Sequence, residues 1–209
     1  MQVTINTGIL IYNDVEVLDF AGPFEVFSTA SRVKSRQDND DVPFFKVFTI
    51  GETKSLKIAR GGLKIFPEYD ITKHPDIDLL IIPGGIITKE LEKNHIVSWI
   101  KTCDEQSKIT ASVCTGAFLL AKAGLLNSKC ATTHYEDVQD LENMFPNIRV
   151  KRNVPWVDQN NIVTSAGISA GIDMSLYLVS RFSNKKLAED TARQMEYFWN
   201  TARSEYDRI

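Results

Sequence analysis

Cysteine and histidine are scarce in this sequence of 209 residues, which contains three of each. No two cysteines form a Cys-x-x-Cys pair, and no two histidines have the His-x-x-x-His spacing of a helical metal site. Zinc sites and disulfide frameworks depend on closely spaced groups of this kind. The sequence therefore predicts neither a disulfide framework nor a metal site.

Long apolar runs and blocks of positive charge are also missing. No apolar run approaches the ~18 residues of a membrane-spanning helix, and the first residues lack the basic segment and cleavage site of a signal peptide. Lys and Arg number 24 against 27 Asp and Glu, for a net charge of −3, and the positive charges are scattered. Nucleic-acid binding relies on clustered positive charge. We therefore expect a cytoplasmic protein that binds neither a membrane nor nucleic acid directly.

Short strand-like runs alternate with longer helical runs along the chain. With 43% hydrophobic residues the chain can form a full core, and this alternation is typical of a parallel sheet covered on both faces. We predict one α/β domain over residues 1–209, built on a doubly wound, mostly parallel sheet with helices on both faces. Strands are expected over residues 3–12, 45–50, 63–66, 77–82, 109–113, 131–133, 148–154 and 162–164. Helices are expected over residues 23–33, 88–106, 116–123, 135–144, 169–182 and 185–199.

Turn-forming residues add local detail to this pattern. The last two predicted strands are expected to pair around residues 158–161, which are rich in turn formers. Pro23 suits the first position of a helix behind Gly22, and Gly124 suits a left-handed helix cap. The polar residues 35–41 predict a mobile loop.

Cys114 lies where a strand-like run passes directly into a helical one. This pattern is typical of a nucleophile elbow, in which small residues two positions away on either side, here Ser112 and Gly116, relieve crowding. A helix N-terminus favours thiolate over thiol, so we expect the pKa of this cysteine to lie below its free value of ~8.5. The alternative is a buried structural thiol, which is the interpretation we adopt for Cys103 and Cys130.

Ligands of such sheets bind outside the carboxyl ends of the strands, so the residues that follow predicted strands are candidate site residues. Gly84 and Gly85 follow one strand, and their amides, together with that of Thr115, predict an oxyanion-binding site. A simple tight turn is the alternative for the glycine pair. His134 follows another strand and is a candidate base for a thiol or a water molecule. Its alternative is a polar residue with structural hydrogen bonds only.

Asp19 lies in an apolar stretch, where burial is expected to raise its carboxyl pKa and allow proton exchange. The alternative is that its side chain caps the following helix. Glu16 is a competing carboxylate in the same stretch, in an exposed turn. His74 and His95 lie in polar stretches and are expected to be solvated.

The motif segments of this chain are residues 18–27, 82–85, 112–116, 131–134 and 166–173. Together they resemble the ThiJ/PfpI branch of the class I glutamine-amidotransferase-like superfamily, over nearly the whole chain. Within that branch they are most similar to isonitrile hydratases and to the amidotransferase-like domain of AraC-type regulators. The resemblance implies a flavodoxin-like fold.

The resemblance also implies a reaction. In isonitrile hydratases the elbow cysteine attacks the isonitrile carbon, and an aspartate assists hydration to an N-substituted formamide. Cys114 and Asp19 occupy those motif positions. The resemblance further implies a small-molecule substrate, a homodimer, and no need for a cofactor or a metal.

Other members of the branch supply the alternatives. Peptidase-type relatives carry histidine directly after the cysteine, where this chain has Thr115, so peptidase activity is not expected. Deglycase or glyoxalase-type relatives use a histidine about twenty residues after the cysteine, a spacing that His134 fits. AraC-type regulators share the motifs but continue into a DNA-binding domain, which we do not expect here. A non-catalytic domain that senses a small molecule or oxidation therefore remains the other alternative.

Overall fold

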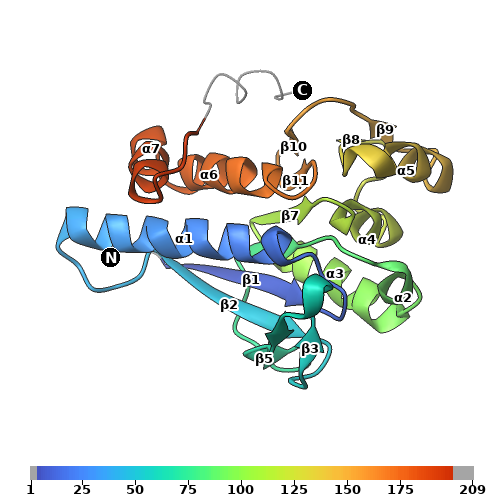
Figure 1. Cartoon of the computed structure of the whole chain (residues 1–209), viewed down its shortest axis with the longest axis horizontal. Coiled ribbons are helices and arrows are strands. Elements are labelled where there is room, and N and C mark those ends of the chain that lie inside the picture. The colour runs from blue at the N-terminus through green and yellow to red at the C-terminus, as the bar shows by residue number, and fades with distance from the viewer. Residues whose placement is uncertain (1–3, 200–209) are drawn as a thin grey trace.

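The computed structural model describes residues 4–199, which form a seven-stranded sheet flanked by helices (Figure 1). The strand order is β10-β11-β7-β6-β1-β2-β5, and every pairing is parallel except β10 with β11. The predicted doubly wound, mostly parallel sheet is confirmed. Its strands are β1 (Ile5–Ile11), β2 (Phe45–Gly51), β5 (Tyr69–Asp70), β6 (Leu79–Ile82), β7 (Ile109–Val113), β10 (Trp156–Gln159) and β11 (Ile162–Ser165). Two small sheets pair β3 (Lys57–Ile58) with β4 (Lys64–Ile65) and β8 (Cys130–Ala131) with β9 (Arg149–Val150).

The helices cover both faces because the crossovers run in opposite directions along the sheet. The chain passes from β1 through α1 to β2 one way, and from β6 through α3 to β7 the other way. Parallel crossovers are right-handed, so α1 and α3 lie on opposite faces. Helices α6 and α7 pack against α1, whereas α4 packs against α3. The helices are α1 (Val17–Asp38), α2 (Thr88–Leu91), α3 (Asn94–Gln106), α4 (Gly116–Lys122), α5 (Val138–Met144), α6 (Ala170–Phe182) and α7 (Lys185–Gln194), with 3₁₀ turns η1 (Arg60–Gly62) and η2 (Tyr135–Asp137).

The direction of the crossovers reverses between β1 and β6, which lie side by side at the centre of the sheet. A crevice opens at such a point outside the carboxyl ends of the strands. The segment after β1, the segment after β6 and the turn after β7 therefore meet at one place. The fold itself brings the candidate residues of three motifs together.

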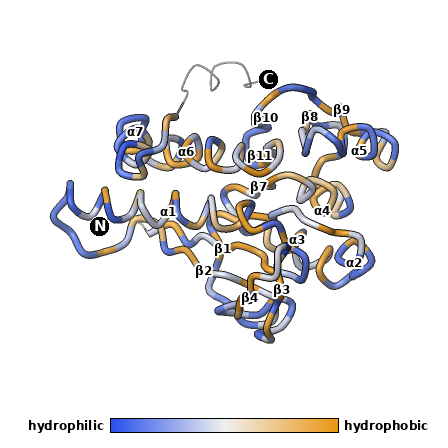
Figure 2. The backbone as a smooth tube through the Cα atoms, viewed as in Figure 1, coloured by the Kyte–Doolittle hydropathy of each residue, from blue (hydrophilic) through white to orange (hydrophobic). Residues whose placement is uncertain are grey.

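The core comprises buried residues of the central strands and of the helices that pack on them. All residues of β6 and β7 are buried, as expected for parallel strands covered on both faces. Figure 2 shows apolar residues along β1 and β7 and hydrophilic residues on the outer side of α7. Within residues 4–199, no helix combines the length and the apolar character needed to cross a membrane.

Helix α1 differs from the sequence prediction at both ends. It begins at Val17 instead of Pro23, and Pro23 lies inside the helix. Proline removes one intrahelical hydrogen bond there, but burial of neighbouring side chains, such as Val26 and Phe27, stabilises this part of the helix. The helix continues to Asp38, so the expected mobile loop over residues 35–41 is wrong for most of its length.

The antiparallel strand pair differs from the sequence prediction in one of its two strands. Trp156–Gln159, and not residues 148–154, pairs with Ile162–Ser165. Trp156 is almost fully buried and stacks on Tyr177 of α6, a tertiary contact that local patterns do not contain. Arg149–Val150 instead pairs in parallel with Cys130–Ala131.

Two other predicted helices are longer than the observed ones. The expected helix over residues 88–106 is interrupted between Leu91 and Asn94. The last helix ends at Gln194, before residue 199. The prediction for Gly124 is confirmed, because it has a left-handed φ of 80° directly after Ala123, the C-cap residue of α4.

Candidate active site

Cys114 occupies the sharp turn between β7 and α4 and has a left-handed φ of 57°. This conformation costs a non-glycine residue roughly 1–2 kcal/mol, which surrounding contacts must offset. The Cys114 amide donates to the carbonyl of Ser165 at 3.2 Å, and the Cys114 carbonyl accepts from Thr133 Oγ1 at 2.9 Å. The elbow predicted from the sequence is therefore present and is held from two sides.

Close backbone packing against β6 explains the glycines around the elbow. A Cβ atom on Gly116 would lie 2.1 Å from the carbonyl oxygen of Ile82. A Cβ atom on Gly84 would lie 2.6 Å from the backbone nitrogen of Thr115. Both distances are far below van der Waals contact, so the elbow fits against the end of β6 only with glycine at these positions.

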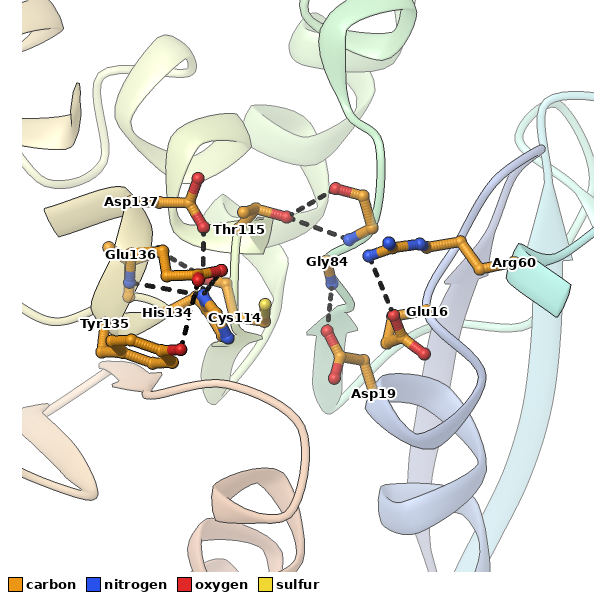
Figure 3. A network of polar contacts seen from close by, with 12 residues as sticks. Glu16, Asp19, Arg60, Gly84, Cys114, Thr115, His134, Tyr135, Glu136 and Asp137 are labelled. Carbon is orange, nitrogen blue, oxygen red and sulfur yellow. Dashed lines mark hydrogen bonds and ion pairs between the residues drawn. The ribbon is translucent and has the colours of Figure 1, made fainter.

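Asp19 lies in the first turn of α1 and is fully buried beside the elbow (Figure 3). Its Oδ2 atom accepts a hydrogen bond from the Gly84 amide at 3.0 Å. Its Oδ1 atom has no hydrogen-bond partner of ordinary geometry. The Cys114 thiol lies close enough to interact with this carboxyl. Burial, opposed by the Gly84 hydrogen bond and reinforced by the charge of Glu16, raises the pKa of Asp19 to about 7. The capping alternative is wrong, because α1 begins before Asp19.

Burial also raises the pKa of the Cys114 thiol, to about 12, and the nearby charge of Asp19 adds to this effect. A hydrogen bond from the Thr115 amide opposes it, while Asp137 reinforces it. The expected pKa below ~8.5 is therefore wrong. Desolvation and the nearby acidic groups disfavour the charged thiolate at this position.

The amides of the glycine pair already have partners. Gly84 N–H donates to Asp19, and Gly85 N–H donates to Thr115 Oγ1 at 2.9 Å. Thr115 Oγ1 in turn donates to the Gly85 carbonyl at 2.9 Å. The predicted oxyanion site therefore differs in its available donors. The two glycine amides are hydrogen-bonded to protein side chains, and the Thr115 amide is the predicted donor that faces the sulfur.

His134 lines the same pocket as Cys114 but bonds to acidic neighbours (Figure 3). Its Nδ1 atom accepts from the Glu136 amide at 3.4 Å and lies 3.3 Å from Asp137 Oδ2. Gly167 packs so closely on the ring that a Cβ atom there would lie 2.1 Å from His134 Cδ2. The structure therefore brings His134 to the site and fixes its ring against a carboxylate.

A pocket of about 210 Å³ opens above the thiol. Glu16 forms part of its wall and pairs with Arg60 at 3.1 Å. Its lining comprises Glu16, Arg60, Gly85, Cys114, Thr115, His134, Glu136, Asp137 and Ile168. Four of these residues were not predicted from the sequence, namely Arg60, Glu136, Asp137 and Ile168. The two acids directly follow His134, so their position after a strand was an available signal, but nothing local marks Arg60.

The remaining cysteines and histidines lie apart from this pocket. Cys103 and Cys130 are buried and unpaired, which is consistent with structural thiols. His74 is half-buried and accepts a hydrogen bond from Trp99 Nε1 at 3.0 Å, so it is less solvated than expected. His95 is exposed and bonds to Glu52. Among residues 4–199, no group of His, Cys, Asp and Glu side chains is arranged to hold a metal ion.

Sequence comparison finds related proteins along most of the chain. The sequence profile of the DJ-1/PfpI family matches residues 7–181. An isonitrile hydratase from Pseudomonas putida is 29% identical over 93% of this chain and 79% of its own length. The HTH-type transcriptional regulator GbdR from Pseudomonas aeruginosa is 25% identical over 91% of this chain, which spans about half (50%) of the regulator.

Structural comparison finds the same fold. The crystal structure of a ThiJ/PfpI family protein from Pseudomonas syringae superposes with a TM-score of 0.82 and 24% identity. The match covers 95% of this chain and 77% of that protein. At this identity the similarity establishes the fold, while the chemistry rests on the site itself.

Proposed function

Because this chain belongs to the DJ-1/PfpI family, we propose that it is a cysteine-dependent hydratase that converts an isonitrile to an N-substituted formamide at Cys114. The observation that carries this proposal is the buried carboxyl of Asp19 facing the elbow thiol. The similarity to isonitrile hydratase along 93% of the chain supports it.

The first step joins the thiol to the isonitrile. Cys114 begins as a neutral thiol, because burial raises the pKa of its sulfur to about 12. As the bond forms between Sγ and the terminal carbon, the Asp19 carboxylate takes the thiol proton and returns it to that same carbon. The product is a thioimidate, in which carbon is bonded to sulfur, hydrogen and nitrogen. No net proton enters or leaves the site.

The second step adds water and releases the cysteine. Water forms a bond to the thioimidate carbon while one of its protons passes through Asp19 to nitrogen. The carbon–sulfur bond then breaks as the remaining hydroxyl proton passes through Asp19 to sulfur, leaving the formamide and the thiol. Isonitrile plus one water therefore equals the formamide, and the enzyme returns to its initial state.

The pKa of about 7 suits Asp19 to both steps. An acid–base group works best when its pKa lies near the working pH, because it then both accepts and returns protons readily. The Thr115 amide would support the charge that develops around sulfur. Gly84 and Gly85 would serve indirectly by holding Asp19 and Thr115 in place.

The deglycase alternative assigns the base to His134. Asp19 contributes to the raised pKa of the Cys114 thiol, while His134 accepts a hydrogen bond from the Glu136 amide and lies against Asp137. Glu16, the other carboxylate weighed from the sequence, is paired with Arg60. These contacts favour the hydratase.

Three variants test the assignment, with formamide formation from an alkyl isonitrile measured by NMR. We expect Cys114→Ala to abolish turnover and Asp19→Asn to lower kcat/KM by at least ~100-fold, the usual contribution of acid–base assistance. His134→Ala should have a smaller effect, and Cys103→Ala is the matched cysteine control. For the wild type, kcat/KM should rise with pH through about 7 as Asp19 ionises.

Other outcomes would assign the protein differently. An essential His134 with a dispensable Asp19 would indicate a deglycase-type enzyme. A wild-type protein inert toward isonitriles and α-oxoaldehydes alike would indicate a sensor domain, for which Cys114 oxidation would be the next measurement.

A further inference from the structure

Tyr12 lies directly after β1, beneath the site, with its side chain almost fully buried. Its hydroxyl donates to the carbonyl oxygen of Pro83 at 2.8 Å. That carbonyl shares one peptide group with the Gly84 amide, which donates to Asp19 Oδ2 at 3.0 Å. Two hydrogen bonds therefore connect Tyr12 to Asp19 through a single peptide group.

The electronic structure of the peptide couples the two hydrogen bonds. The group is planar and conjugated, so a donor on its oxygen draws electron density away from its nitrogen. The N–H then becomes a better donor, and such chains strengthen each bond by roughly 10–30%. The gain is largest where the acceptor is a carboxylate in a buried site.

Gly84, which carries this N–H, is also held in position through the peptide group that follows. The Gly84 carbonyl accepts from the Glu16 amide at 2.9 Å, and the elbow leaves no space for a Cβ atom at Gly84. The Gly84 amide therefore donates to Asp19 from a residue that is held by its other contacts. Tyr12 supplies the remaining contact, at the Pro83 end of the Pro83–Gly84 peptide.

We propose that Tyr12 is a positioning residue, which holds the Pro83–Gly84 peptide and strengthens its N–H as a donor to Asp19. Its influence on catalysis rests on the proposed function, whereas its influence on Asp19 does not. Besides Tyr12, the titratable groups that act on Asp19 include Glu16 before α1 and Cys114 in the elbow. Glu90 of α2 faces Tyr12 as well.

Tyr12 is suited to act as a permanent donor. Burial, together with the nearby Asp19, Glu90, Cys114 and Glu16, raises the pKa of the phenol well above its ordinary range. The hydroxyl therefore keeps its proton at every pH at which Asp19 titrates. A hydroxyl that ionised within the pH range of the Asp19 titration would not donate its hydrogen bond throughout that titration.

The test is the titration of Asp19 in Tyr12→Phe, followed by NMR of protein labelled with ¹³C at the aspartate carboxyl carbons. The Asp19 signal is identified by its absence in Asp19→Asn. Loss of the hydroxyl weakens the bond that favours the ionised carboxylate, so we expect the Asp19 pKa to rise, by roughly 0.1–0.7. The pH midpoint of kcat/KM should move by the same amount.

Tyr177→Phe is the matched control, because it also removes a buried hydroxyl, one that donates to Asp158. It should leave the Asp19 titration unchanged. A folded Tyr12→Phe protein with an unaltered Asp19 titration would overturn the proposal, even if its activity fell. Absence of isonitrile turnover in the wild type would count against the proposed function only, because the titration needs no substrate.

A second substitution avoids the loss of a buried hydrogen bond. Replacement of Tyr12 by 3-fluorotyrosine keeps the hydroxyl and makes it a stronger donor. We expect the Asp19 pKa to fall in this protein, opposite to the effect of Tyr12→Phe. A shift in the same direction for both proteins would contradict a role through the peptide group.

Discussion

Asp19 and Cys114 face each other in a buried crevice, and the charge of Asp19 makes Cys114 harder to ionise. Burial raises the pKa of the carboxyl to about 7 and that of the thiol to about 12. The pair therefore holds its proton on sulfur, with a carboxyl beside it that changes state near neutral pH. A resting thiol with an adjacent base differs from the preformed thiolate that a helix N-terminus suggests.

Stability should depend on pH through Asp19. Its folded pKa of about 7 lies above its unfolded value of ~3.9, so the folded state binds more protons between these limits. The stabilisation is fully present below ~pH 4 and is lost as the pH rises through about 7, by at most about 4 kcal/mol. Asparagine does not ionise, so this loss of folding stability is absent in Asp19→Asn. Relative to the wild type, we therefore expect Asp19→Asn to be more stabilising at pH 8 than at pH 5.

Urea unfolding at the two pH values measures this difference. Asp41→Asn, a change of the same charge at an exposed position, is the control and should show no such pH dependence. Equal effects of Asp19→Asn at both pH values would mean that the Asp19 pKa is not raised.

The rate of Cys114 alkylation should depend on the ionisation of Asp19 and not on a lowered pKa of the thiol. We expect iodoacetamide to modify Cys114 slowly near pH 6 and faster above pH 7, when the Asp19 carboxylate can accept the thiol proton. Mass spectrometry of the labelled peptides measures the rate, with buried Cys103 and Cys130 as internal references. Rapid modification near pH 6, unchanged in Asp19→Asn, would restore the thiolate interpretation.

At the scale of elements, the site depends on how closely the turn after β7 approaches the end of β6. Glycine at positions 84 and 116 permits this approach, and the hydrogen bonds of Cys114 to the end of β11 and to Thr133 fix the turn. The left-handed backbone of Cys114 is thus maintained by contacts between elements that are distant in sequence.

Gly116→Ala should disrupt this contact. Its Cβ atom would overlap the Ile82 carbonyl, so β6 or α4 must move, and we expect a loss of about 2–4 kcal/mol in the free energy of unfolding. Gly22→Ala is the control, because its Cβ atom would meet the movable side chain of Ile172 at 3.0 Å in the interior of α1. Alanine is also the better helix former, so Gly22→Ala should change stability by less than ~1 kcal/mol. Thermal or urea unfolding compares the two.

In the molecule as a whole, α1 and α3 cover opposite faces of the sheet, and the pocket lies at the strand ends between these two layers.

Apolar side chains are exposed on the segment around β3 and β4, namely Leu56, Ile58, Leu63 and Phe66. Phe66 is the most exposed of these, at 71%. Exposed apolar groups that lie close together mark candidate contact surfaces.

We expect the protein to form a homodimer, as its family resemblance implies and as symmetric assemblies commonly do. Light scattering should give twice the 23.6 kDa mass of the chain. Phe66→Ser should weaken the association if the β3–β4 segment forms the contact, whereas Met144→Gln, at an exposed apolar residue on α5, should not. A monomer at micromolar concentration would contradict the expectation.

Local sequence patterns were sufficient to predict the alternation of strands and helices, the parallel sheet and the elbow at Cys114. These features depend on local periodicity and on backbone positions that accept only small residues, which neighbouring residues express directly. The sequence also indicated Asp19, because a carboxyl in an apolar stretch is unusual, and it placed Gly84, Gly85, Thr115 and His134 at strand ends.

The interactions among these residues depend instead on contacts between elements that are distant in sequence. The start of α1 before Pro23 and the pairing of Trp156–Gln159 depend on burial against distant elements, which no local pattern contains. The thiol pKa depends on desolvation and on acids brought in by other elements. Arg60 lines the pocket from the short turn η1 and belongs to no motif of the sequence. A sequence fixes such local geometry through its neighbours, but charge, burial and hydrogen-bond partners depend on groups that the fold brings together.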